Sequence, residues 1–325
     1  LTSRFILYRC RLKVEVPEVT EDKEELEEFN VEYLDKIVDL CKKNNVDIIL
    51  IQGSANVGGN PWKRYNTVQE LAKQYGLDYI DLNEYNSEIG IDWALDSSDM
   101  NHLNVVGSKK WTDFLGTFLS NKYEYTDCRN TNEPAEFKKN IEAYQNILEM
   151  VEEKRTLLQA TNLYQYLDTL YNLNKKENVI FISLCGNATM SYTDYVQNML
   201  YNIGFDLDIQ EGDWWNYYGI LDEGRIVSEN TSKTEIGEEG LLDNQKSYSI
   251  LSGDELLGTK ASIMINVTEY GQCGQGINIV VYNKKYDEVL SSVYFNINEN
   301  DNPATGRIKD GENQIEKEVN IWENE

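Results

Sequence analysis

The chain has 325 residues, of which 56 are Asp or Glu and 30 are Lys or Arg, so its formal net charge is −26 with the single histidine neutral. This charge disfavours nucleic acid and anionic membrane surfaces as partners, because both are bound through clustered Lys and Arg. Hydrophobic residues make up 41% of the chain and aromatic residues 11%, which excludes a wholly disordered acidic chain. The length predicts about two domains.

The chain has no apolar run near the roughly 20 residues of a membrane-spanning helix. The longest run, residues 46–51, is interrupted by Asp47. The cysteines are isolated, without Cys-x-x-Cys spacing, which fits neither a disulfide framework nor a zinc site and favours a reducing, cytoplasmic compartment. They are Cys10, Cys41, Cys128, Cys185 and Cys273. The first residue is Leu rather than Met and no apolar signal core follows it, so we expect a fragment or a processed form, and an extracellular location stays open.

The first 130 residues alternate between helix and strand patterns. Apolar side chains recur every three or four positions in residues 31–41, 68–75 and 106–119, which predicts three helices. Residues 46–51 form a short β-branched run typical of a buried strand, and residues 77–82 alternate as a second strand. This order predicts parallel pairing in a doubly wound α/β sheet, whose functional loops lie at the carboxyl ends of its strands.

The loop after the second predicted strand contains the only histidine, His102. Asp99 stands three residues before it. A carboxylate there can accept the ring N–H, fix the tautomer and leave the other nitrogen free to act as a base. The alternative is structural: Asp99 or Asn101 caps the following helix while His102 only packs.

The stretch Asp99-x-x-His102-Leu103-Asn104-x-x-Gly107-x-Lys109, after the strand end Asp81-Leu82-Asn83, resembles the carboxyl-terminal block of the SGNH/GDSL hydrolases. The preceding helix and strand, residues 33–41 and 48–51, are similar to the last αβ units of that family, especially its bacterial teichoic-acid D-alanyl-transfer-like branch. The resemblance covers about residues 1–130. It implies a flavodoxin-like fold and acyl transfer through a serine ester, with His102 as general base and Asp99 as its orienting acid. It implies no metal and no organic cofactor.

Family members carry the nucleophile in a Gly-Asp-Ser segment after their first strand, and no such sequence precedes the histidine motif here. We therefore expect the nucleophile, and the amino-terminal half of the sheet, in a segment upstream of Leu1. Ser54, just after Gly53 at a predicted strand end, is the alternative nucleophile, against a simple turn serine. Gly58-Gly59-Asn60 matches the family's Gly-x-Asn oxyanion block but follows the wrong strand, so we interpret it as a loop.

The second part of the chain reads as a separate module. Residues 134–171 are predicted to be helical, with residues 131–160 as a connector between the domains. A β-rich domain over residues 161–300 and a polar, acidic tail over residues 301–325 follow. Within that domain we predict a helix ending at Gly204 and the strands 179–184, 217–221, 261–267, 277–282 and 289–295.

The segment Gly274-Gln275-Gly276 with the strand after it, followed by Ser292-Val293-Tyr294-Phe295, resembles the interleukin-like EMT inducer (ILEI, or PANDER-like) domain. The resemblance covers about residues 160–298, and the strand–helix half precedes the Gly-Ile-Asn strand, so a rearranged version is implied. The family implies a β-sandwich-like, non-catalytic domain that binds glycan or protein. Gly274-x-Gly276 is not a dinucleotide loop, because it lacks the third glycine and precedes a strand.

An aromatic cluster, Trp214, Trp215, Tyr217 and Tyr218, could stack on a sugar, although such clusters in β-rich domains more often fill a core. The sequence thus predicts an α/β SGNH-type domain, its parallel sheet incomplete, joined to an α+β ILEI-like domain. The expected function is serine esterase or acyltransferase action on an acylated glycan or small ester. The alternative is a non-catalytic glycan- or protein-binding protein with a degenerate hydrolase scaffold. The sequence does not predict an oligomeric state.

Overall fold

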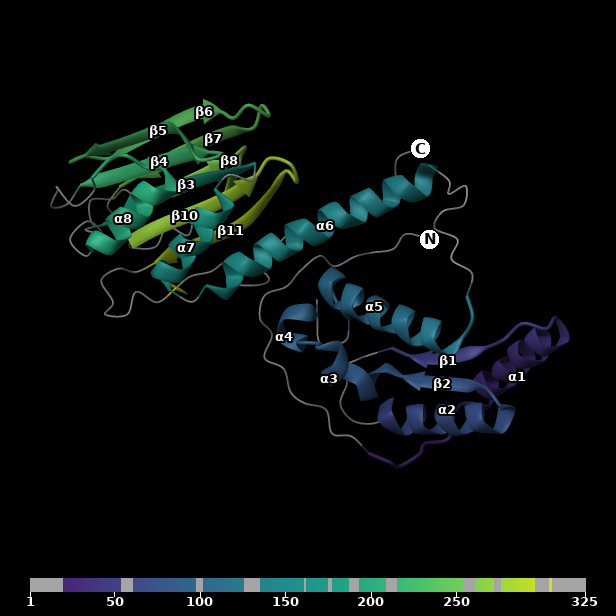
Figure 1. The fold of residues 1–325 in the computed structure, drawn as a ribbon. Coiled ribbons are helices and arrows are strands. Elements are labelled where there is room, and N and C mark those ends of the chain that lie inside the picture. The colour runs from purple at the N-terminus through teal and green to yellow at the C-terminus, as the bar shows by residue number, and fades with distance from the viewer. Residues whose placement is uncertain are drawn as a thin grey trace. The chain divides into compact units, whose positions relative to one another are not determined.

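The computed structural model describes residues 20–53, 61–97, 102–125, 135–160, 162–174, 177–186, 193–208, 215–253, 261–271, 276–295 and 304–305. Within these ranges the protein is mixed α/β, with one parallel strand pair and two antiparallel sheets (Figure 1). The chain divides into two compact units. The first comprises Leu1–Ile141 together with Glu316–Glu325, and the second comprises Glu142–Ile315.

The first unit contains two parallel strands and the helices that connect them. Its elements are α1 (Glu28–Lys43), β1 (Ile49–Gln52), α2 (Pro61–Tyr75), β2 (Asp78–Asp81), η1 (Leu82–Tyr85), α3 (Asn86–Ile89), α4 (Trp93–Asp96) and α5 (Val105–Lys122). The three predicted helices, the two predicted strands and their parallel pairing are confirmed.

Helices α2 and α5 lie on opposite faces of the β1–β2 pair (Figure 1). On one face, Tyr65 of α2 is hydrogen-bonded to the Gln52 side chain. On the other face, the Lys122 ammonium at the end of α5 lies 2.6 Å from a carboxylate oxygen of Asp78. Gln52 is paired with Asp81, so these two side chains share one face of the strand pair. Asp78 is three positions before Asp81, and side chains an odd number of positions apart point to opposite faces of a strand.

Strand β1 is less buried than its sequence predicts. Its side chains are half-buried or exposed, and Ile51 is 39% exposed. The physical reason is that β1 pairs only with β2 among the described strands, so its other edge has no described neighbour. Parallel strands are normally covered on both faces and flanked by partners.

Helix α1 carries apolar side chains on two sides. One side includes Val38, which is buried. The other side exposes large hydrophobic residues at helical spacing, each more than half exposed: Phe29, Tyr33, Ile37 and Leu40. We call these four residues the α1 stripe. An apolar stripe of this kind normally marks a surface that another element covers.

The second unit is built from two antiparallel sheets and the helices beside them. Its helices are α7 (Leu163–Leu173), α8 (Asp194–Ile203) and, from Glu142 onward, α6 (Ala135–Gln159), whose first residues belong to the first unit. Its strands are β3 (Asn178–Cys185), β4 (Asn216–Asp222), β5 (Arg225–Ser232), β6 (Ile236–Leu241), β7 (Ser247–Ser252), β8 (Ser262–Ile265), β9 (Thr268–Glu269), β10 (Gly276–Asn283), β11 (Glu288–Phe295) and β12 (Ala304–Thr305). The sheet orders are β12-β11-β10-β3-β4-β5 and β6-β7-β8-β9.

The residues predicted to be helical, 134–171, form two helices. Helix α6 ends at Gln159 and α7 begins at Leu163. The cause is local: the Asn162 side chain accepts a hydrogen bond from the backbone N–H of Gln165 and so caps α7.

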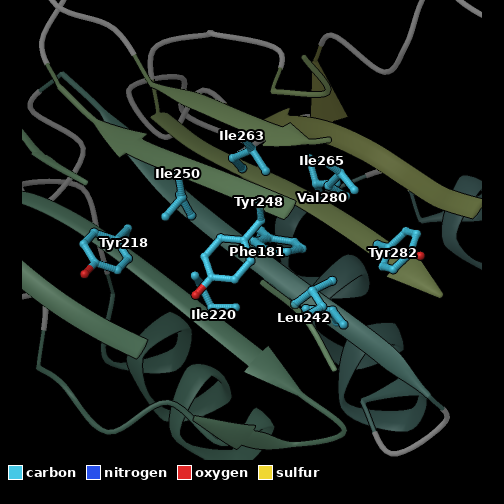
Figure 2. Packing of buried hydrophobic residues seen from close by; sticks show 11 residues of the cluster. Phe181, Tyr218, Ile220, Leu242, Tyr248, Ile250, Ile263, Ile265, Val280 and Tyr282 are labelled. Atoms are coloured by element: carbon cyan, nitrogen blue, oxygen red, sulfur yellow. The ribbon is translucent and has the colours of Figure 1, made fainter. Parts of the chain in front are cut away.

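The core of the second unit lies between its two sheets. Strands β3 and β10 are adjacent and buried along their whole length. Side chains from both sheets meet in one cluster (Figure 2), which includes Phe181, Tyr218, Ile250, Ile263 and Val280. Helix α7 packs on the opposite face of the six-stranded sheet, where the Tyr166 ring contacts Phe295. This two-sided burial explains why both strands are continuous apolar runs.

A half-buried carboxylate, Glu238, joins the two sheets near their edge. It accepts hydrogen bonds from the hydroxyls of Tyr218 (2.8 Å), Tyr248 (3.2 Å) and Ser228. Burial raises the pKa of Glu238, but the three hydroxyl donors outweigh it and the pKa lies below its ordinary value. Burial and the Glu238 charge raise the pKa of Tyr248 to about 12.

Replacement of Phe181 by Ala should destabilise the second unit by about 3–5 kcal/mol, because it leaves a cavity in a fully buried site. Urea-dependent hydrogen exchange of β3 and β10 peptides measures this change. Leu241→Ala on β6 is the control, because Leu241 is 64% exposed and its loss should change stability by less than about 0.5 kcal/mol. Equal effects of the two substitutions would contradict the core assignment.

Glu238→Gln should weaken the acid sensitivity of the second unit. A carboxyl with a lowered folded pKa stabilises the fold above its ordinary value of 4.5 and loses that contribution as the pH falls through the folded pKa. The unfolding midpoint of the wild type should therefore fall more steeply than that of the variant between about pH 5 and about pH 3. Glu239→Gln, at the exposed neighbouring position, should behave like the wild type. Parallel pH profiles for the wild type and Glu238→Gln would refute the linkage.

Candidate functional site

Polar side chains gather where the carboxyl ends of β1 and β2 meet. Gln52 and Asp81 are paired across the two strand ends. The Asp81 carboxylate accepts hydrogen bonds from the backbone N–H (2.9 Å) and the side-chain amide (2.8 Å) of Asn83. The same amide lies 3.4 Å from the carbonyl oxygen of Gly53. This edge is where α/β sheets bind their ligands.

Two tyrosines near this edge were not predicted as site residues from the sequence. Burial and the Asp81 charge raise the pKa of Tyr65, whose hydroxyl is hydrogen-bonded to Gln52. Burial and the same carboxylate raise the pKa of Tyr79, and its buried hydroxyl has no hydrogen-bond partner within the described ranges. A buried donor without a partner costs about 1–3 kcal/mol, so water or a ligand is expected there. The alternation of residues 77–82 could have indicated Tyr79, because it places Tyr79 and Asp81 on the same face of the strand.

Helix α5 begins at an asparagine cap. The Asn104 side-chain oxygen accepts hydrogen bonds from the backbone N–H groups of Val106 (3.0 Å) and Gly107 (3.1 Å). Asn104 therefore fills the N-cap position of α5, and the caps proposed from the sequence, Asp99 and Asn101, lie outside the described residues.

The loop before α5 is closed at its base. Ser97 and Leu103 form an isolated antiparallel bridge. The Asn104 backbone N–H donates to the carbonyl oxygen of Asp96 (2.8 Å), and its side-chain amide donates to the carbonyl oxygen of Leu95 (2.8 Å). Asn104 thus ties both ends of the loop together while it caps the helix.

The carboxylate of Asp96, at the base of this loop, is fully buried. Its Oδ2 atom accepts hydrogen bonds from the Lys110 ammonium (2.6 Å) and from the backbone N–H of Asp92 (2.8 Å). Lys110 also donates to the Gly90 carbonyl (2.8 Å). A single lysine on α5 therefore holds the end of α4 and the residue after α3. The motif residue Lys109 instead pairs with Asp113 on the same helix, where both side chains are about half exposed or more.

His102 lies on the exposed side of this closed loop. It directly precedes the bridge residue Leu103 and stands two positions before the cap Asn104. Asp99, its predicted orienting acid, and Ser54, the alternative nucleophile, lie outside the described residues. The structure therefore places the predicted base at an anchored, solvent-facing position.

In the second unit, the aromatic cluster divides into core and surface. Tyr217 and Tyr218 are 1% and 3% exposed, and their hydroxyls donate to Glu229 and Glu238. Trp215 is half-buried, and the Lys233 ammonium lies 5.5 Å from its ring centroid. Trp214 lies outside the described residues.

Within the described ranges, no three His, Cys, Asp or Glu side chains are grouped as metal ligands would be. None of the helices in that part of the chain is long and apolar enough to cross a membrane. No protein-family model, curated protein or solved structure matches the chain. Function has to be argued from the residues themselves.

Gly107→Ala should destabilise the first unit, whereas Gly116→Ala on the same helix should not. A methyl group at Gly107 would overlap the carbonyl oxygen of Asp96, while one at Gly116 meets nothing within 4 Å. We expect a loss of about 1–3 kcal/mol for Gly107→Ala and a gain of up to about 1 kcal/mol for Gly116→Ala. Hydrogen exchange of α5 peptides in urea measures both changes. A stabilising Gly107→Ala would contradict the close packing at the loop base.

Proposed function

We propose that this chain is the histidine-bearing part of an SGNH-type serine esterase or acyltransferase that acts on acylated carbohydrate. The observation that carries the proposal is the solvent-facing His102 on a loop closed at its base, beyond the carboxyl edge of a parallel strand pair. A general base must be held in place and accessible to substrate, and this position meets both needs.

In the proposed reaction, a serine hydroxyl attacks the ester carbonyl carbon while His102 takes the hydroxyl proton. Asp99 stabilises the imidazolium that forms. The alcohol then leaves with the proton from His102, and the acyl group remains on the serine oxygen. Water or a second hydroxyl attacks this acyl-enzyme, again giving its proton to His102, and regenerates the serine.

The topology of the first unit leaves a position for a further strand before α1. Helix α1 packs beside α2, since Tyr75 donates a hydrogen bond to Asp35 and Lys42 lies 3.3 Å from the Tyr75 carbonyl oxygen. Crossovers between parallel strands are right-handed, so a strand before α1 would lie beside β1 on the edge away from β2. That edge has no described neighbour. The exposed Ile51 and the α1 stripe provide apolar surface for such an addition.

A non-catalytic glycan- or protein-binding protein is the second candidate function. The partly exposed Trp215 in the second unit favours it, because an indole face can stack on a sugar ring. The lack of a Gly-Asp-Ser segment before the histidine motif favours it as well.

Labelling with a fluorophosphonate serine probe tests the proposed function. It should be applied to the 325-residue chain and to the same chain extended upstream as its gene encodes, and read by intact mass and peptide mapping. We expect one adduct on an upstream serine in the extended chain. His102→Ala should slow that labelling by about 10²–10⁴-fold, since the base that activates the serine is lost.

Asp113→Asn is the matched control for His102→Ala, because it changes an exposed charge on the adjoining helix α5 and should leave labelling unchanged. An adduct on Ser54 in the 325-residue chain would support the same class of reaction but would identify Ser54 as the nucleophile. If neither folded chain is labelled, or if the gene encodes no upstream segment and Ser54 stays unlabelled, the hydrolase proposal fails and the binding function replaces it.

A further inference from the structure

The ion pair between Lys110 and Asp96 stands out because one partner is completely buried. The Asp96 side chain has no exposed surface, whereas that of Lys110 is 31% exposed. A carboxylate removed from water is costly unless it is paired and hydrogen-bonded. The arrangement of the groups around Asp96 is therefore strongly constrained.

Asp96 connects the two ends of the His102 loop through different atoms. Its carboxylate binds Lys110 on α5, and its carbonyl oxygen accepts the N–H of Asn104 at the start of the same helix. Gly107 lies so close to this carbonyl that no side chain fits there. His102 belongs to the segment that spans these anchor points.

We propose that Lys110 is a positioning residue for His102, acting through the buried carboxylate of Asp96. By holding Asp96 against α5, Lys110 fixes both ends of the loop and hence the orientation of the imidazole. The importance of this role for catalysis rests on the proposed function. The mechanical coupling from Lys110 to His102 does not depend on any reaction.

The chain contains a single histidine, so its imidazole gives one set of nuclear magnetic resonance signals that need no assignment by mutation. The experiment compares the imidazole ¹H and ¹⁵N shifts, which report tautomer and hydrogen bonding, in the wild type and in Lys110→Met. We expect the shifts to change in Lys110→Met and to return toward wild-type values in Lys110→Arg, which restores a cation near Asp96.

Lys110→Met alone leaves Asp96 buried and unpaired, so that variant can lose its local fold. The double variant Lys110→Met with Asp96→Asn avoids this, because the amide oxygen still accepts the Asp92 N–H. Hydrogen exchange of α5 peptides verifies that it is folded. Asp113→Asn removes the neighbouring exposed ion pair and should leave the His102 shifts unchanged. Wild-type shifts in the folded double variant would overturn the proposal.

The same variants separate this inference from the proposed function. In the upstream-extended chain, the double variant should label with fluorophosphonate about 100-fold more slowly than the wild type, because a displaced base is a poor catalyst. Changed His102 shifts without any labelling of the wild type would retain the positioning role and remove the hydrolase. Labelling with unchanged His102 shifts would retain the hydrolase and remove the positioning role.

Discussion

The buried carboxylate of Asp96 is the group on which the geometry of the candidate site depends. Taking such a charge out of water costs several kcal/mol, and Lys110 together with the Asp92 N–H compensates for it. These contacts join the segment after α3 and the end of α4 to the second turn of α5, which lies on the other side of the His102 loop in sequence. Because few other arrangements satisfy a buried charge, the loop ends are held in one relative position.

The elements with strong periodicity could be predicted from the sequence, whereas the cap of α5 could not. Asp99, Asn101 and Asn104 are all good N-cap residue types, so local preference does not choose among them. The choice depends on tertiary contacts, because Asn104 donates to the Leu95 carbonyl while it caps α5. The importance of Lys110 over the motif residue Lys109 likewise depends on which side of α5 meets Asp96.

Strands β5 and β6 show where sequence patterns lose their predictive value. β5 is an edge strand whose second half, Ser228 onward, is polar, and β6 contains Gly237 and Gly240. Neither resembles the continuous apolar run that identifies β3. Both strands exist because the sheet beside them supplies partners, and Glu238 gains three hydroxyl donors only after the two sheets have packed. Tertiary context therefore decides these strands.

Strands β1 and β3 show that an apolar sequence allows a strand to be buried but does not ensure it. Both are β-branched runs, yet β3 has paired neighbours on both edges and lies buried along its whole length, whereas β1 has one described partner and exposes Ile51. The sequence gives the polarity of the side chains, whereas their burial depends on the elements that pack against them. The α1 stripe and the edge of β1 that has no described neighbour thus follow one rule: apolar side chains stay exposed where none of the described elements packs against them.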